Sequence, residues 1–186
     1  MGQVMTSPQV QTDNVWWGLG VYVESQAAVM GVNAMLAKMF PLGSGNDTAV
    51  IRVSGVQFGP GLGGGADTTL LIATGITSPL AFPSVTADSG WSLSLRDIIS
   101  ATSTPKSCYN IARLVATVPT KDILDTALKN PSYRNSLKDV VEAFYQSIVM
   151  GKSAALKEKK LYIFKLVGGG FEASLAYQCF NQTDLL

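Results

Sequence analysis

The stretch that most constrains the fold is residues 130–151, because it carries the signals for both ends of one long helix. Asn130 suits an N-cap, Pro131 the first helical position, and Gly151 the position just past the end. Apolar residues recur between them at helical spacing and form a broad stripe: Tyr133, Leu137, Val140, Val141, Phe144, Tyr145, Ile148 and Val149. A stripe of this width must be covered, so we expect a helix at about residues 131–150 that packs on a sheet or on two other helices.

Shorter helices are expected just before this long one, and strands on both sides of the helical segment. Residues 94–100, 108–118 and 121–130 have helical spacing. The strand patterns cover residues 48–58, 68–76, 160–167 and 171–180. Glycine-rich connections indicate that the first two strands form one hairpin and the last two another. The order of strands, helices and strands predicts an α+β fold, with an antiparallel sheet formed by N- and C-terminal hairpins and packed against the helical middle segment.

Residues 15–41 carry weaker patterns. The segment "VWWGLGVYVE" at 15–24 is apolar and fits a strand or the first turns of a helix. The next segment, residues 26–40, predicts a helix capped by Ser25 and ended by Pro41, because five apolar residues share one helical face: Ala28, Val32, Met35, Leu36 and Met39. Residues 77–92 are predicted to be irregular because Pro79, Pro83 and Gly90 interrupt them.

The length of 186 residues fits one domain. Residues 1–14 are polar and predict a disordered lead-in, which leaves residues 15–186 as a single α+β domain. Hydrophobic residues make up 47% and charged residues only 15% of the chain, a balance that suits a secreted or self-assembling protein better than a highly charged cytosolic enzyme. No signal peptide is recognisable, and prolines break the longest uncharged run, residues 68–87, so no transmembrane helix is expected. A cytoplasmic or membrane-peripheral location is favoured.

The sequence contains no histidine, which removes the usual general base near neutral pH and the commonest metal ligand. This argues against an enzyme and leaves open only catalysis by carboxylates, Lys, Tyr or Cys. We predict no catalytic residues, no metal and no cofactor. Cys108 and Cys179 do not have zinc-ligand spacing, and either a disulfide or two buried thiols would be consistent with them.

A glycine-rich loop at residues 59–65 is the candidate ligand loop. Residues 61–66, "GLGGGA", match the dinucleotide fingerprint, but a strand pattern follows where that fingerprint requires a helix. A pocket for another small ligand could still lie under the loop, with Lys165 and Glu172 as further polar groups near it. The candidate ligand-loop residues are Gly61, Gly63, Gly64, Gly65 and Asp67.

Two stretches suggest an interaction surface. Trp16 and Trp17 are adjacent, so in a strand they cannot both enter one core, and one of them is a candidate for a surface or an interface. The second stretch is a cluster of cations with interleaved aromatic residues: Lys152, Lys157, Lys159, Lys160 and Lys165. Such a cluster could contact a membrane surface or single-stranded nucleic acid. The acidic balance of residues 1–95 makes nucleic acid the less favoured partner.

The start of the chain fits an N-myristoylation pattern, which makes Gly2 a lipidation candidate. Residues 1–8, "MGQVMTSP", resemble the start of a gammaretroviral Gag polyprotein, which also opens Met-Gly-Gln and reaches a Thr-x-Pro-like stretch. That resemblance implies an all-helical matrix domain with a basic face near the N-terminus. The first half of this chain is acidic and rich in strand patterns, so no family is assigned from it.

These features together predict a non-enzymatic interaction or assembly protein that acts at a surface, either at a membrane periphery or as a viral or secreted structural subunit. Its expected partner is another protein or a second copy of the chain, and a membrane surface is a further option. A small-ligand-binding or histidine-independent catalytic domain with a pocket near residues 59–65 is the first alternative. Nucleic-acid binding through residues 152–165 is the second.

Overall fold

A computed structural model describes residues 12–27, 30–58, 63–94, 106–146, 159–166 and 177–186. The described strands form one seven-stranded sheet in the order β5-β6-β4-β1-β2-β3-β7. The strands are β1 (Trp16–Ala27), β2 (Met30–Pro41), β3 (Ala49–Phe58), β4 (Gly63–Thr74), β5 (Thr86–Ser94), β6 (Lys160–Leu166) and β7 (Tyr177–Leu185). The helices are η1 (Pro79–Ser84), α2 (Lys106–Ala116), η2 (Thr120–Asp122), α3 (Ile123–Lys129) and α4 (Pro131–Phe144).

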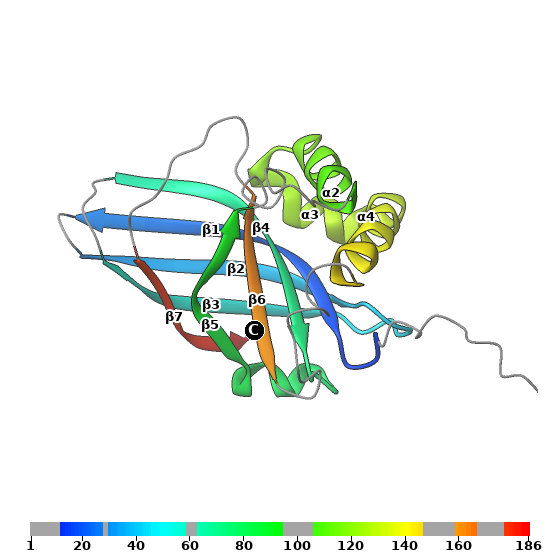
Figure 1. The fold of residues 1–186 in the computed structure, drawn as a ribbon, viewed down its shortest axis with the longest axis horizontal. Helices are drawn as coiled ribbons and strands as arrows, with labels where there is room; N and C mark the ends of the chain where they lie inside the picture. The colour runs from blue at the N-terminus through cyan, green and yellow to red at the C-terminus, as the bar shows by residue number, and fades with distance from the viewer. Residues whose placement is uncertain (1–11, 28–29, 59–62, 95–105, 147–158, 167–176) are drawn as a thin grey trace, which may run out of the picture.

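The sheet is curled into a half-barrel. Neighbouring strands are antiparallel except β5 and β6, which are parallel. The strands at the two edges, β5 and β7, approach to within 8 Å between Cα atoms, and η1 lies against β7. Helices α2, α3 and α4 group together over one end of the sheet, while the β1–β2 hairpin extends away from them (Figure 1).

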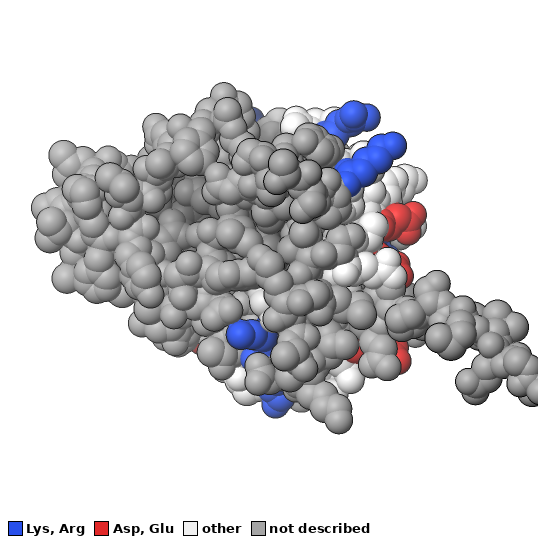
Figure 2. Space-filling view, in the orientation of Figure 1, with Lys and Arg blue, Asp and Glu red and all other residues white. Residues whose placement is uncertain are grey.

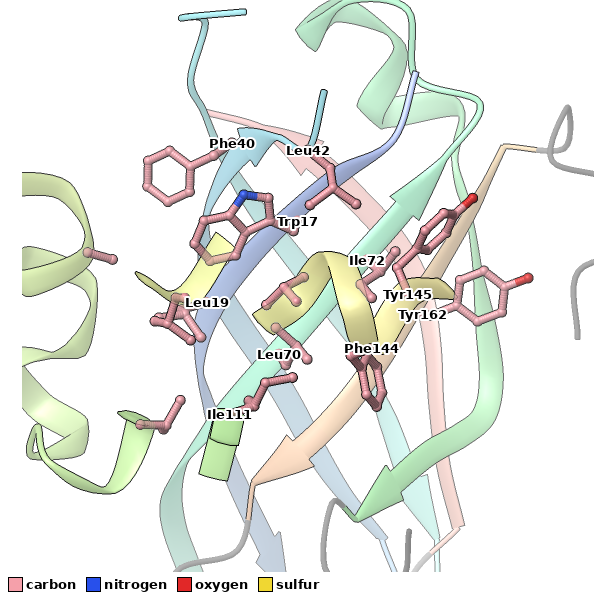
Figure 3. Packing of buried hydrophobic residues seen from close by; sticks show 14 of the residues in the cluster. Trp17, Leu19, Phe40, Leu42, Leu70, Ile72, Ile111, Phe144, Tyr145 and Tyr162 are labelled. Carbon is pink, nitrogen blue, oxygen red and sulfur yellow. The ribbon is translucent and has the colours of Figure 1, made fainter. Parts of the chain in front are cut away.

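Two hydrophobic cores lie on the two faces of the sheet. The inner core fills the curl with side chains from the strands and η1, including Met35, Ile51, Leu71 and Phe82. The outer core lies between the sheet and the helices, where Leu19, Leu70 and Ile72 meet side chains of α2 and α4 such as Ile111 and Phe144 (Figure 3). Because successive residues of a strand point to opposite faces, the central strands β1 and β4 contribute to both cores.

The adjacent tryptophans lie in different cores. Trp16 is 5% exposed, packs edge to face on Phe82 with ring centroids 5.5 Å apart, and donates a hydrogen bond from Nε1 to the Ile76 carbonyl at 3.2 Å. Trp17 is fully buried in the outer core, with its ring centroid 5.3 Å from that of Phe40. Neither indole is exposed, which corrects the expectation that one of them lies at the surface. The strand alternation accommodates one of them in each core.

The predicted α+β class, the antiparallel sheet from both ends of the chain and the helical middle segment are confirmed. Helix α4 begins at Pro131 as expected, and the Asn130 side chain caps it by accepting a hydrogen bond from the Tyr133 backbone N–H at 3.1 Å. The sequence predicts that this helix continues to residue 150, but residues 147–150 lie outside the described part of the chain. The helices expected at 108–118 and 121–130 correspond to α2 and α3.

The helix expected at residues 26–40 is instead the second arm of a hairpin. Strand β2 pairs with β1 along its whole length, from Ala27↔Met30 to Trp16↔Pro41. Burial follows a period of two, because Met35, Ala37 and Met39 are fully buried whereas Leu36 between them is 40% exposed. The helical interpretation placed Met35 and Leu36 on one face. Pairing on both sides of the strand and burial of the methionines override the helical spacing.

The strand partners also differ from those expected. β3 and β4 are not paired with each other, because β3 lies between β2 and β7 and β4 lies between β1 and β6. β6 and β7 are likewise separated by four strands. The consecutive strands that do pair are β1 with β2 and β2 with β3. Residues 77–92 are not irregular throughout, because η1 and most of β5 lie within them.

Candidate functional site

The candidate residues of the glycine-rich loop are distributed between a strand and undescribed chain. Gly63, Gly64 and Gly65 belong to β4, where they pair with Gln26, Ser25 and Glu24 of β1. This strand begins earlier than expected, so the loop proposed at 59–65 is in part a regular strand. Asp67 also lies in β4, opposite Tyr22, and its side chain is not described. Gly61, Glu172 and the lipidation candidate Gly2 lie outside the described residues.

The structure describes only part of the predicted cationic cluster. Lys152 and Lys157 lie outside the described residues, and the Lys165 side chain is not described. Lys159 is exposed and donates a hydrogen bond to the Ser84 hydroxyl at 3.3 Å. The Lys160 ammonium lies 5.9 Å from the centroid of the Tyr162 ring. On the face shown in Figure 2, basic and acidic side chains both occur along the described surface.

The two cysteines lie on different elements. Cys108 belongs to α2 and Cys179 to β7, and neither side chain is described. The sequence-based expectation of either a disulfide or two buried thiols therefore stays a prediction. Within the described ranges, no group of three or more Cys, Asp or Glu side chains is arranged to hold a metal ion.

A pocket of about 360 Å³ lies where the end of β2, the β2–β3 turn and the helices α3 and α4 meet. Its lining combines apolar groups from the sheet with polar and charged groups from the turn and α4: Trp17, Phe40, Pro41, Gly45, Asn46, Asp47, Thr48, Leu128, Arg134, Asn135 and Lys138. The volume lies at the small end of the range of pockets that bind small molecules. This pocket is the candidate site considered in the described part of the chain.

Arg134 forms one wall of the pocket and is held in position on two sides. Its Nη1 donates hydrogen bonds to the carbonyls of Ala127 and Leu128, at 3.0 Å each, at the end of α3. Its guanidinium carbon lies 5.2 Å from the centroid of the Phe40 ring, a cation–π distance. A guanidinium has five N–H donors, so these contacts leave donors available to a ligand.

Lys138 lies one turn further along α4 and also lines the pocket. Its ammonium donates a hydrogen bond to the Gly43 carbonyl at 3.2 Å and so ties α4 to the β2–β3 turn. An ammonium has three donors, and one is used here. Residues four apart share a helix face, so Arg134 and Lys138 present two positive charges to the same pocket.

The aromatic part of the pocket is formed by Trp17 and Phe40. Trp17 Nε1 is buried and has no hydrogen-bond partner among the described residues. In Figure 3 the indole nitrogen lies on the edge of the ring toward Phe40 and Leu42, away from Leu19. An unpaired buried N–H costs about 1–3 kcal/mol.

Asp47 supplies the negative charge of the pocket. It belongs to the exposed β2–β3 turn, and the structure gives it no cation within ion-pair distance among the described residues. An ion pair lies elsewhere, between Arg52 of β3 and Asp184 of β7, at 3.2 Å. The pocket therefore carries a carboxylate and two cations that line the same space without neutralising one another.

Sequence reasoning did not find this pocket. Arg134 and Lys138 were part of the long helix, Phe40 and Pro41 were the end of a supposed helix, and Asp47 was a loop residue. The i, i+4 pair of cations on α4 was a visible signal, but nothing in the sequence joins it to a turn some ninety residues earlier. The fold makes that connection through the Lys138–Gly43 hydrogen bond.

None of the helices in the described part of the chain is long and apolar enough to cross a membrane. Comparisons with protein-family models, with curated proteins and with solved structures give no match. The chemistry of the residues that line the pocket is therefore the basis for proposing its function.

Proposed function

We propose that the protein works by binding rather than by catalysis, and that the pocket between the β2–β3 turn and α4 takes a small organic ligand with an anionic group. The observation that carries the proposal is the placement of Arg134 and Lys138 beside the aromatic rings of Trp17 and Phe40. An anion would accept hydrogen bonds from the two cations, and an apolar body would lie against the accessible side chains of Pro41 and Leu128, next to the buried rings. Charge-assisted hydrogen bonds of this kind are stronger than neutral ones.

A titration with 3-phenylpropionate tests this proposal, followed by the indole N–H resonances of ¹⁵N-labelled protein. The Trp17 resonance is assigned by its loss in Trp17→Phe. We expect it to shift on titration, while the Trp16 resonance stays in place because Trp16 lies on the other face of the sheet. The uncharged 3-phenylpropionamide is expected to bind more weakly.

Lys138→Gln gives the matched test of the charge. It removes one cation of the pocket and is expected to weaken 3-phenylpropionate binding, whereas Lys121→Gln, on the exposed η2 turn, leaves it unchanged. The proposal is wrong if 3-phenylpropionate and 3-phenylpropionamide bind equally. It is also wrong if neither compound shifts the Trp17 resonance and phenylalanine fails to shift it as well.

Self-assembly is a second candidate function, and one observation favours it. Val32 is 61% exposed and Leu36 is 40% exposed, and both lie on the outer face of β2, on the side opposite the buried methionines. A second copy of the chain could cover this apolar strip. The molar mass from light scattering tests it: Leu36→Asp should dissociate a homo-oligomer, whereas Leu80→Asp, on the exposed η1 helix, should not. A wild-type monomer at all concentrations would exclude it.

A further inference from the structure

We infer that the ligand of this pocket is a zwitterion, namely an α-amino acid with an aromatic or large apolar side chain. The inference rests on the proposed function and adds the role of Asp47. Simple anion binding needs Arg134 and Lys138 alone, and it would be weakened by a carboxylate in the same pocket. The presence of Asp47 in the lining needs a separate explanation.

The charges of the lining match the groups of an α-amino acid. Arg134 and Lys138 project from one helix face, and Asp47 comes from the turn, so the two signs enter the pocket from different elements. Asp47 does not pair with either cation, although all three line one space of about 360 Å³. A ligand with a carboxylate and an ammonium on one carbon would pair with the cations and with Asp47 at the same time.

The position of the two cations favours the carboxylate end on the α4 side. The Arg134 guanidinium is already oriented by the Ala127 and Leu128 carbonyls and by the Phe40 ring, so little further ordering is needed when a carboxylate binds. The planar fork of an arginine matches the two oxygens of a carboxylate. The ligand ammonium would then face the turn that carries Asp47.

The apolar surface provides a place for the side chain of the ligand. Trp17, Phe40, Pro41 and Leu128 form the apolar part of the lining. Leu128 is 40% exposed, and a bound side chain would cover it. Because Trp17 and Phe40 are buried, the ligand side chain would lie mainly against Pro41 and Leu128, and a large side chain such as that of phenylalanine would cover most of this apolar surface.

The test compares four compounds that share one side chain: phenylalanine, N-acetylphenylalanine, phenylalanine amide and 3-phenylpropionate. Binding is measured by calorimetry and by the shift of the Trp17 indole resonance. We expect phenylalanine to bind roughly fivefold or more tightly than each of the other three, because each lacks one charged group.

Asp47→Asn separates this inference from the proposed function. In this variant phenylalanine should lose its advantage over 3-phenylpropionate, while binding of 3-phenylpropionate itself stays equal or improves. Asp125→Asn, on the exposed first turn of α3, is the control and should preserve the advantage. If 3-phenylpropionate binds as tightly as phenylalanine in the wild type, or if Asp47→Asn keeps the preference, the zwitterion inference is wrong while the anion-binding proposal stands.

Discussion

The Arg134 guanidinium lies over the ring of Phe40, with its central carbon 5.2 Å from the ring centroid, and so joins the helical layer to the end of β2. The same side chain caps the last turn of α3 through two carbonyls. A lysine cannot make both contacts, because its ammonium is a point charge without a planar fork. We expect Arg134→Lys to lower the free energy of unfolding by about 1–2 kcal/mol.

Urea denaturation measures this effect. Arg113→Lys on the exposed face of α2 is the control and should change stability by less than about 0.5 kcal/mol. An equal effect of the two substitutions would show that neither the stacking on Phe40 nor the hydrogen bonds to the α3 carbonyls contribute to stability.

Neighbouring positions of β2 should respond very differently to truncation. Met35 is fully buried in the inner core and Leu36 is 40% exposed on the other face. We expect Met35→Ala to cost about 2–4 kcal/mol and Leu36→Ala less than about 1 kcal/mol. Thermal unfolding of the two variants under one set of conditions provides the comparison. Similar losses would support a helix here, because a helix would bury the two residues together.

Gly18 should tolerate a methyl group less well than Gly20. A Cβ at Gly18 would overlap the Lys38 backbone carbonyl, which is fixed by its strand. A Cβ at Gly20 would lie 2.7 Å from the Thr69 hydroxyl and 2.9 Å from Met35 Cγ, and both of these side-chain atoms can move. Gly18→Ala should cost about 2–3 kcal/mol and Gly20→Ala less. The reverse order in a denaturant titration would contradict this account.

Two tyrosines of the outer core should give opposite results when their hydroxyl is removed. Tyr133 donates a hydrogen bond to the Leu114 carbonyl at 2.9 Å, whereas the buried Tyr145 hydroxyl has no partner among the described residues. Tyr133→Phe should therefore lose about 1 kcal/mol of stability at neutral pH. Tyr145→Phe should lose nothing or become slightly more stable, and a loss as large as that of Tyr133→Phe would show that its hydroxyl is satisfied.

The same tyrosines should make the protein sensitive to alkaline pH. Burial raises the pKa of Tyr145 to about 12, with a further contribution from nearby Tyr162, and burial alone raises the pKa of Tyr133 to about 12. In the unfolded chain the pKa of a tyrosine is about 10. Between these values only the unfolded state loses its proton, so stability is retained below pH 10 and falls from pH 10 to 12.

Circular dichroism melting across this range checks the alkaline prediction. Tyr145→Phe should show a shallower fall of the melting temperature than the wild type, because it removes one of the two groups. If the melting temperatures of Tyr145→Phe and of the wild type fall in parallel as the pH rises, Tyr145 does not contribute to the loss of stability at alkaline pH.

The sequence predicted those elements whose signals are local. Asn130 and Pro131 marked the start of α4 because capping depends on neighbouring residues alone. The strand predicted at residues 48–58 corresponds to β3, in which Ile51 and Val53 are buried and Arg52 is exposed. The helical interpretation of residues 25–40 failed because their apolar spacing fits both periods, and the pairing of β2 with β1 and β3 decides between them.

The candidate site depended on contacts that no local pattern contains. Phe40, Asp47 and Arg134 come from a strand, a turn and a helix, and they meet only after the helical layer packs on the sheet. The tryptophan pair could be recognised in the sequence. Its meaning changed because the sheet has a core on each face, so that two adjacent large side chains can both be buried.

That tryptophan pair has a consequence for how the protein unfolds. Trp16 belongs to the core inside the curl and Trp17 to the core beneath the helices, and a single peptide bond joins them. Strand β1 therefore cannot leave one core without disturbing the other. The curled sheet and the helical layer should melt in one cooperative transition, and a destabilising change on either face should lower the melting temperature of both together.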